Sequence, residues 1–104
     1  MTNLFADIPA SLPEEVFEDI VSTDHIRIER ILSHGHSSPE TGWYDQSEHE
    51  WVVVLDGQGV IEFEDGTVVT LNRGDYLNIP AGQKHRVAST DRTQVTTWLA
   101  VFYS

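Results

Sequence analysis

The chain has 104 residues, no cysteine and a formal charge of −11, from six basic and seventeen acidic side chains. This length suits one domain over residues 1–104 that buries a core without covalent staples. The lack of cysteine excludes disulfides, thiolate nucleophiles and cysteine-ligated metals, so any metal must be bound by nitrogen and oxygen atoms. The acidic balance repels phosphate backbones and anionic lipids, so we expect neither nucleic acid nor a membrane as partner. We also expect a cytoplasmic location, because no signal-peptide pattern or membrane-length apolar run is seen.

The first predicted element is a short helix near the N-terminus. The segment Ser11-Leu12-Pro13-Glu14 has the pattern of a capping box, in which the serine oxygen accepts an orphan amide and Glu14 reaches back. Val16, Phe17 and Ile20 would then share one helical face.

From His25 onward the pattern predicts β-strands. The first, Ile26–Ile31, alternates isoleucines with charged residues, which is typical of a half-buried strand. Further strands are predicted at Glu50–Leu55, Val60–Glu64, Val68–Leu71, Tyr76–Ile79, His85–Ala88 and Val95–Tyr103.

Glycine-containing turns divide these strands. They lie at Asp56-Gly57, Asp65-Gly66, Asn72-Arg73-Gly74 and Pro80-Ala81-Gly82. Short strands separated at such regular spacing predict an all-β sandwich or small barrel. The longest irregular stretch runs from Ser33 to His49, and long loops of this kind are often functional.

Two motifs in this chain resemble those of the cupin family. The segment from Gly74 to His85 matches the second cupin motif, G-x5-P-x-G-x2-H-x3-N, except that Ser89 stands at the final asparagine. The first motif, G-x5-H-x-H-x3–4-E-x6-G, is kept in its second half, where Glu50 and Gly57 have the expected spacing. Its two histidines are absent. Counting back from Glu50 places Tyr44 and Gln46, or Trp43 and Asp45, at their positions.

The whole chain also resembles small bacterial single-domain cupins. The similar segments include Asn3-Leu4-Phe5, Ser37-Ser38-Pro39, Trp43-Tyr44-Asp45-Gln46, Glu50-Trp51-Val52, His85-Arg86-Val87 and Trp98-Leu99-Ala100. The resemblance implies the double-stranded β-helix of the RmlC-like cupins, a small antiparallel barrel or jelly roll.

The resemblance also implies a site for a divalent metal ion such as iron, manganese, nickel or zinc. In such sites imidazoles and a carboxylate project inward from adjacent strands and leave open positions for substrate. Here the candidate ligands are Glu50 and His85, with Gln46 and Tyr44 as weaker donors. The alternatives are a buried Glu50 carboxylate held by hydrogen bonds or by Arg86, a core histidine at position 85, and pocket-lining roles for Gln46 and Tyr44.

Two further residues are reserve ligands. Asp45 replaces Gln46 if the motif spacing is one residue longer, and His36 lies farther upstream in the same loop. Strand alternation places His49 on the face opposite to Glu50.

Three function classes remain open at this point. The first is a metal-dependent dioxygenase, isomerase or lyase acting on a small organic substrate, or a metal-free enzyme using Glu50, Tyr44 and His85 for acid–base chemistry. The second is a non-catalytic module that binds a small molecule and keeps a degenerate metal site. The third is a purely structural dimer. A homodimer is expected in any case, because both faces of the Glu50–Leu55 strand are apolar and one barrel interior buries only one of them.

Overall fold

The computed structural model describes residues 2–39 and 41–104, which form eight β-strands and no helix. The strands are β1 (Val16–Ser22), β2 (Ile26–Ser33), β3 (His49–Asp56), β4 (Gln58–Phe63), β5 (Val68–Asn72), β6 (Tyr76–Ile79), β7 (His85–Thr90) and β8 (Thr96–Tyr103). The all-β prediction is therefore confirmed. None of the described residues supplies a helix long and apolar enough to cross a membrane.

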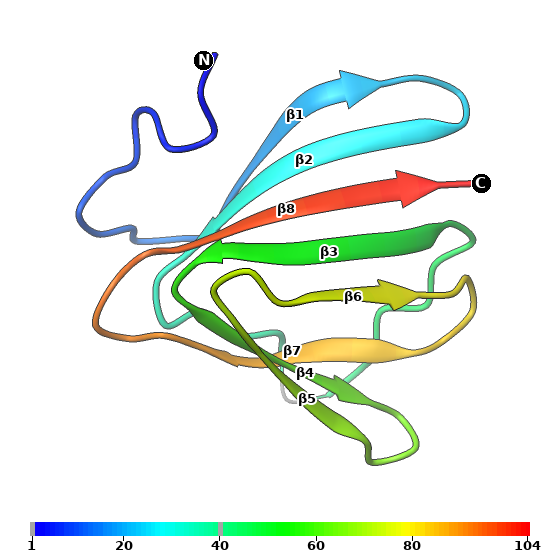
Figure 1. The fold of residues 1–104 in the computed structure, drawn as a ribbon. Helices are drawn as coiled ribbons and strands as arrows, with labels where there is room; N and C mark the ends of the chain where they lie inside the picture. Colours follow the sequence, from blue (N-terminus) through cyan, green and yellow to red (C-terminus); the bar gives the residue numbers. More distant parts are fainter. Residues whose placement is uncertain (1, 40) are drawn as a thin grey trace.

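The strands form two antiparallel sheets that face each other (Figure 1). The larger sheet has the strand order β1-β2-β8-β3-β6, and the smaller one has the order β5-β4-β7. Strand β8 lies at the centre of the larger sheet and pairs with β2 on one side and β3 on the other. The last strand in the sequence therefore joins the first hairpin to the rest of the sheet.

The core lies between the two sheets. Alternate residues of β8 point into it, and Trp98, Ala100 and Phe102 are all buried there. The other buried members of this cluster are Val52, Val54, Ile61, Phe63, Leu71 and Ile79. Such burial of apolar area is the main favourable term in folding, at about 25 cal/mol per Å².

One close approach between the sheets requires a glycine. Gly59 in β4 lies under the ring of Trp98, and a Cβ atom at position 59 would come within 2.1 Å of the indole Cη2. The neighbouring Gly57 has a positive φ of 90°, which other residues rarely adopt. These two glycines let the β3–β4 turn bring the smaller sheet against β8.

The predicted N-terminal helix is wrong. Residues Val16–Ser22 form strand β1, which pairs with β2 from Val16 opposite Leu32 to Ser22 opposite Arg27. The segment is rich in β-branched residues, and the ladder with β2 satisfies backbone groups that one short helix would leave unpaired. Ser11 to Glu14 lie in an irregular lead-in to this strand.

The loop between β2 and β3 runs along the edge of β7. Ser38 exchanges two hydrogen bonds with Val87, through its backbone N–H at 2.9 Å and its hydroxyl oxygen at 3.0 Å. Tyr44 forms an isolated antiparallel bridge with His85. The predicted irregular segment is thus attached to the strand that carries the motif histidine.

Candidate functional site

A cavity of about 310 Å³ lies between the sheets. Its lining combines apolar side chains with ionisable ones. These residues are Glu15, Phe17, Arg27, Glu29, Ile31, Tyr44, Gln46, Glu50, Val52, Ile61, His85, Val87, Trp98 and Phe102. Apolar and polar residues contribute equally to this lining, and apolar walls with convergent polar groups are typical of a small-molecule site.

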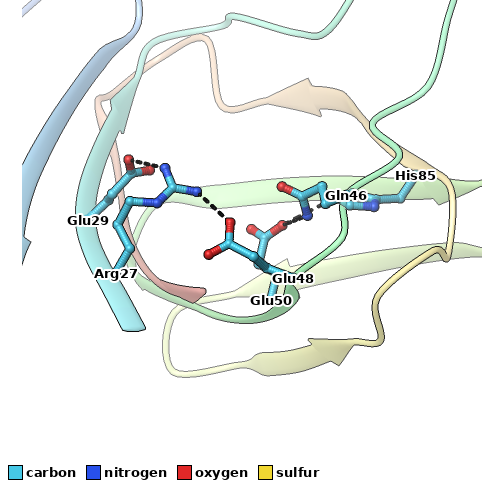
Figure 2. A network of polar contacts seen from close by, with 6 residues as sticks. All are labelled: Arg27, Glu29, Gln46, Glu48, Glu50 and His85. Atoms are coloured by element: carbon cyan, nitrogen blue, oxygen red, sulfur yellow. Dashed lines mark hydrogen bonds and ion pairs between the residues drawn. The ribbon is translucent and has the colours of Figure 1, made fainter. Parts of the chain in front are cut away.

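Glu50 and His85 meet on the wall of this cavity. Glu50 lies in β3 and His85 begins β7, and their Oε1 and Nε2 atoms are 3.3 Å apart. Both side chains are largely buried, with 13% and 5% of their surface exposed. Gln46 donates a second hydrogen bond to the same Glu50 oxygen at 3.1 Å, so the carboxylate is held from two directions (Figure 2).

The backbone determines which nitrogen of His85 carries the proton in its neutral form. Nδ1 lies 3.0 Å from the carbonyl oxygen of Gln83, and a carbonyl only accepts, so Nδ1 must donate. In neutral His85 the Nε2 atom therefore presents a lone pair to Glu50, and in the imidazolium form it carries a proton and donates. A lone pair directed at a carboxylate is unfavourable, so the Glu50–His85 contact requires a proton or another cation between the two atoms.

The pKa of His85 reflects this arrangement. Burial lowers the pKa of the imidazole, but the hydrogen bond to Glu50, the hydrogen bond to the Gln83 carbonyl and the Glu50 charge outweigh it. The net result is a His85 pKa raised above its ordinary value of 6.5.

A second polar group lies at the other end of the network in Figure 2. The Arg27 guanidinium donates to Glu29 at 2.9 Å and to Glu48 at 3.2 Å, and it stacks over the Phe102 ring at 4.1 Å. Arg27 and Glu29 line the cavity from β2. The alternation in the Ile26–Ile31 segment predicts isoleucines on one face and charges on the other, and the structure turns Arg27 and Glu29 toward the cavity. The charged face of this strand was the sequence signal for these two residues. Alternation alone does not say which face of a half-buried strand packs against the rest of the protein.

Comparison with known proteins assigns the chain to a family. A family model described as the cupin domain matches residues 28–102. The chain is a cupin. The family resemblance seen in the Glu50 and His85 motifs is thereby confirmed.

Two solved structures are similar to this cupin. A protein of Ralstonia eutropha JMP134, described as a candidate mannose-6-phosphate isomerase, has a TM-score of 0.95 and 42% identity, over 100% of this chain and 97% of that one. An RmlC-like cupin with a double-stranded β-helix fold from Methanocaldococcus jannaschii has a TM-score of 0.72 and 17% identity, over 93% and 86% of the two chains. The second likeness concerns the fold alone.

One curated protein gives a partial match. The uncharacterised protein YdbB of Bacillus subtilis (strain 168) is 40% identical to this cupin over 57 residues, which is 51% of this chain and 50% of YdbB. The match therefore spans about half the length of that relative.

The structure brings the four predicted site residues of this cupin together. Glu50, His85, Gln46 and Tyr44 all line the cavity, with Tyr44 about half exposed and its ring centroid 5.7 Å from that of His85. The reserve ligands Asp45 and His36 are not among the lining residues. The ring of His36 is instead held between the His34 N–H and the Pro13 carbonyl.

Two other sequence expectations are settled by contacts. Arg86 forms an ion pair with Glu62 at 2.6 Å, and Glu50 is held by Gln46 and His85. His49 faces away from the cavity as predicted, but its Nδ1 accepts a hydrogen bond from the Ala81 N–H at 2.9 Å. His49 therefore supports the turn that leads into His85, which strand alternation alone did not indicate.

The donor set of this cupin fits a weakly held divalent ion. The Nε2–Oε1 separation of 3.3 Å suits two atoms that bind one ion, and the Nδ1 contact to a carbonyl is typical of a metal-ligating histidine. Within residues 2–39 and 41–104, however, no three His, Cys, Asp or Glu side chains gather at metal-binding distances. Glu50 and His85 would be the strong ligands, with the Gln46 amide and Tyr44 hydroxyl as weak ones.

Proposed function

We propose that this cupin binds a small organic molecule in the cavity between its sheets and moves a proton on it, as an isomerase or lyase. The observation that carries the proposal is the buried contact between Glu50 Oε1 and His85 Nε2 at the cavity wall. Each partner is held by a further hydrogen bond, Glu50 by Gln46 and His85 by the Gln83 carbonyl. Such orientation is what general acid–base catalysis requires.

The roles of the two groups follow from their protonation. With the shared proton on His85, the Glu50 carboxylate accepts a proton from a substrate carbon next to a carbonyl group, and His85 Nε2–H donates to the carbonyl oxygen. In an isomerisation, protonated Glu50 returns the proton to the former carbonyl carbon, and the now neutral His85 takes the proton of the hydroxyl on the deprotonated carbon, which becomes the new carbonyl. In an elimination, a group leaves with its bonding electrons from the carbon on the other side of the deprotonated one, and the enol proton returns to His85. The apolar lining from Val52, Trp98 and Phe102 excludes water from the reacting carbon.

The likeness to the Ralstonia protein supports an isomerase. That protein is 42% identical to this cupin over essentially the whole of both chains, and its description names an isomerase. Proton transfer between adjacent carbons is the step that such aldose–ketose chemistry needs.

A divalent ion is the second candidate component, as the donor set fits one. Held by Glu50 and His85, it would supply Lewis-acid polarisation of a substrate oxygen. We expect His85→Ala to abolish Mn²⁺ binding measured by calorimetry and Gln46→Ala to weaken it several-fold. His25→Ala, at an exposed residue outside the cavity, serves as the control. Unchanged Mn²⁺ binding by His85→Ala would rule out this ligand set.

Deuterium exchange tests the acid–base proposal directly. The protein is incubated with EDTA in D₂O with small hydroxy and amino carbonyl compounds, including dihydroxyacetone and mannose 6-phosphate, and loss of the C–H signal is followed by NMR. Glu50→Gln should lower exchange by about 100-fold or more, the usual contribution of a positioned base. Glu64→Gln makes the same change at an exposed carboxylate and should leave exchange intact.

The alternative function has its own outcome in this experiment. If the wild-type protein binds compounds of the panel in its cavity but exchanges none of their protons, the cupin is a non-catalytic binding module. The acid–base role of Glu50 and His85 would then be wrong.

A further inference from the structure

The charges that line the cavity are unbalanced. Three carboxylates, Glu15, Glu29 and Glu50, face the same space as the Arg27 guanidinium and the His85 imidazole that is paired with Glu50, so acidic groups outnumber basic ones. The formal charge of the whole chain has the same sign, at −11. Acidic walls of low dielectric concentrate the negative potential inside a cleft.

Arg27 offsets only part of this charge. Its guanidinium is already shared between the Glu29 and Glu48 carboxylates, at 2.9 and 3.2 Å. Two carboxylates on one guanidinium leave a net negative charge at that end of the cavity. An incoming phosphate would have to displace a carboxylate from Arg27 while approaching the others.

Among the described residues, Glu15 has no cationic partner, and Glu29 shares Arg27 with Glu48. Glu15 accepts a hydrogen bond at 2.7 Å from the neutral hydroxyl of Ser33. Glu29, 8% exposed, has a pKa raised by burial and by the neighbouring Asp19 carboxyl, against the opposing charge of Arg27. A cation in the cavity would stabilise the ionised forms of both Glu15 and Glu29.

Aromatic rings complete the lining. Phe17, Trp98 and Phe102 border the cavity, and the face of Phe102 already receives the Arg27 guanidinium at 4.1 Å. Aromatic faces attract organic cations by their quadrupole, most strongly when the cation is desolvated. A cavity of about 310 Å³ also has room for an organic body beyond a bare ion.

We propose that this cavity selects a compact organic cation, an ammonium group on a short apolar body, over phosphorylated or other anionic molecules. The proposal rests on the proposed function and names the substrate class of the same cavity. It also separates this cupin from the phosphosugar chemistry named for its Ralstonia relative. The carboxylates and aromatic rings of the lining attract the ammonium group, and Glu50 and His85 act on the reacting carbon.

The test compares three probes that differ in charge. Choline is the cation, 3,3-dimethylbutan-1-ol is its neutral counterpart of the same shape, and mannose 6-phosphate is the anion. Binding is measured by calorimetry in EDTA at low ionic strength, and the indole signal of Trp98 in NMR reports occupancy of the cavity. We expect choline to bind at least tenfold more tightly than the neutral alcohol and mannose 6-phosphate not to shift the Trp98 signal.

Two variants assign the selectivity to the cavity carboxylates. Glu29→Gln and Glu15→Gln should each weaken choline binding several-fold and leave the neutral alcohol unaffected. Asp65→Asn removes a charge from the exposed β4–β5 turn and should change neither. If one of the two cavity variants misfolds, the other still tests the proposal. The NMR spectrum of each variant shows whether it is folded.

Each contrary outcome is decisive. Equal affinity for choline and the neutral alcohol, tighter binding of mannose 6-phosphate, or no binding of any probe would overturn the cation proposal. Deuterium exchange on the panel of hydroxy and amino carbonyl compounds, which includes neutral and cationic molecules, tests the Glu50–His85 chemistry separately. Exchange without choline selectivity removes only the substrate class, and choline selectivity without exchange removes only the acid–base reaction.

Discussion

His85 is the residue whose two nitrogens face different partners. Nδ1 donates to the Gln83 carbonyl and Nε2 faces Glu50, with the Tyr44 ring alongside. The folded protein therefore binds a proton at His85 more tightly than the unfolded chain does. The free energy of unfolding therefore depends on whether His85 is protonated.

We predict a pH-dependent contribution of this pair to stability. Because the His85 pKa is raised on folding, the contribution is complete below the ordinary value of 6.5 and is lost as pH rises through the folded pKa. Urea unfolding of wild type and Glu50→Gln at several pH values measures it. The difference in unfolding free energy should be larger at pH 6 than at pH 9, and a constant or growing difference would contradict the assignment.

Gly59 is the second residue on which the site depends. A methyl group there would overlap the Trp98 ring, which lines the cavity. We expect Gly59→Ala to cost about 1–3 kcal/mol of unfolding free energy, the usual range for overpacking. It should also displace the Trp98 indole signal in NMR.

A second substitution separates steric overlap from strand propensity. Trp98→Phe removes the atoms nearest to the added methyl, so the double variant should be less destabilised than the sum of the two single changes. Additive effects would show that Gly59 is needed for another reason.

At the scale of elements, the N-terminal segment is held on the outer face of the large sheet by one buried side chain. Arg30, 1% exposed, donates to the carbonyl oxygens of Leu4 and Ala6 and to the Glu18 carboxylate. Each of these acceptors would lose its partner if Arg30 were replaced. The lead-in to β1 therefore depends on a residue of β2.

We predict that Arg30→Met detaches this segment. Unpaired acceptors cost on the order of 2 kcal/mol, part of which Glu18 recovers by solvation because it is about one third exposed. Hydrogen exchange should speed up in residues 2–10 while β3 and β8 stay protected. Arg73→Met, at an exposed turn, is the control, and an unchanged exchange pattern in Arg30→Met would contradict the role of Arg30.

At the scale of the whole molecule, the outer face of the large sheet keeps apolar surface. Tyr76 is 68% exposed and its ring lies 5.8 Å from that of Trp51 on the neighbouring strand. Both residues lie on the face opposite to Val52 and the core. Exposed aromatic pairs on a sheet are typical of protein interfaces.

We therefore expect a homodimer that forms through this face. Light scattering at micromolar concentration should give a dimer mass for the wild type and a monomer mass for Tyr76→Glu. Val68→Glu makes a similar change at a 56% exposed residue of the small sheet and should leave the dimer intact. A monomeric wild type would refute the prediction.

The sequence alone determined the elements whose signal is local. The strand from Tyr76 to Ile79 has the predicted bounds, and the others agree within a few residues, because turn glycines and alternation act over neighbouring positions. The motif around His85 and the spacing from Glu50 to Gly57 also placed two residues that meet in the cavity. Residue type and spacing are enough to predict a residue's position where a single motif specifies both a turn and the start of the strand that follows it.

Only the tertiary structure decided what depends on distant partners. Val16–Ser22 became a strand because β2 offered a ladder, which outweighed a local capping pattern. The inward position of Arg27 and Glu29 follows from the packing of β2 beside β8, and the proton position on His85 follows from the Gln83 carbonyl. Periodicity divides the residues of a strand between two faces. Which face is buried depends on packing against segments that are far away in the sequence.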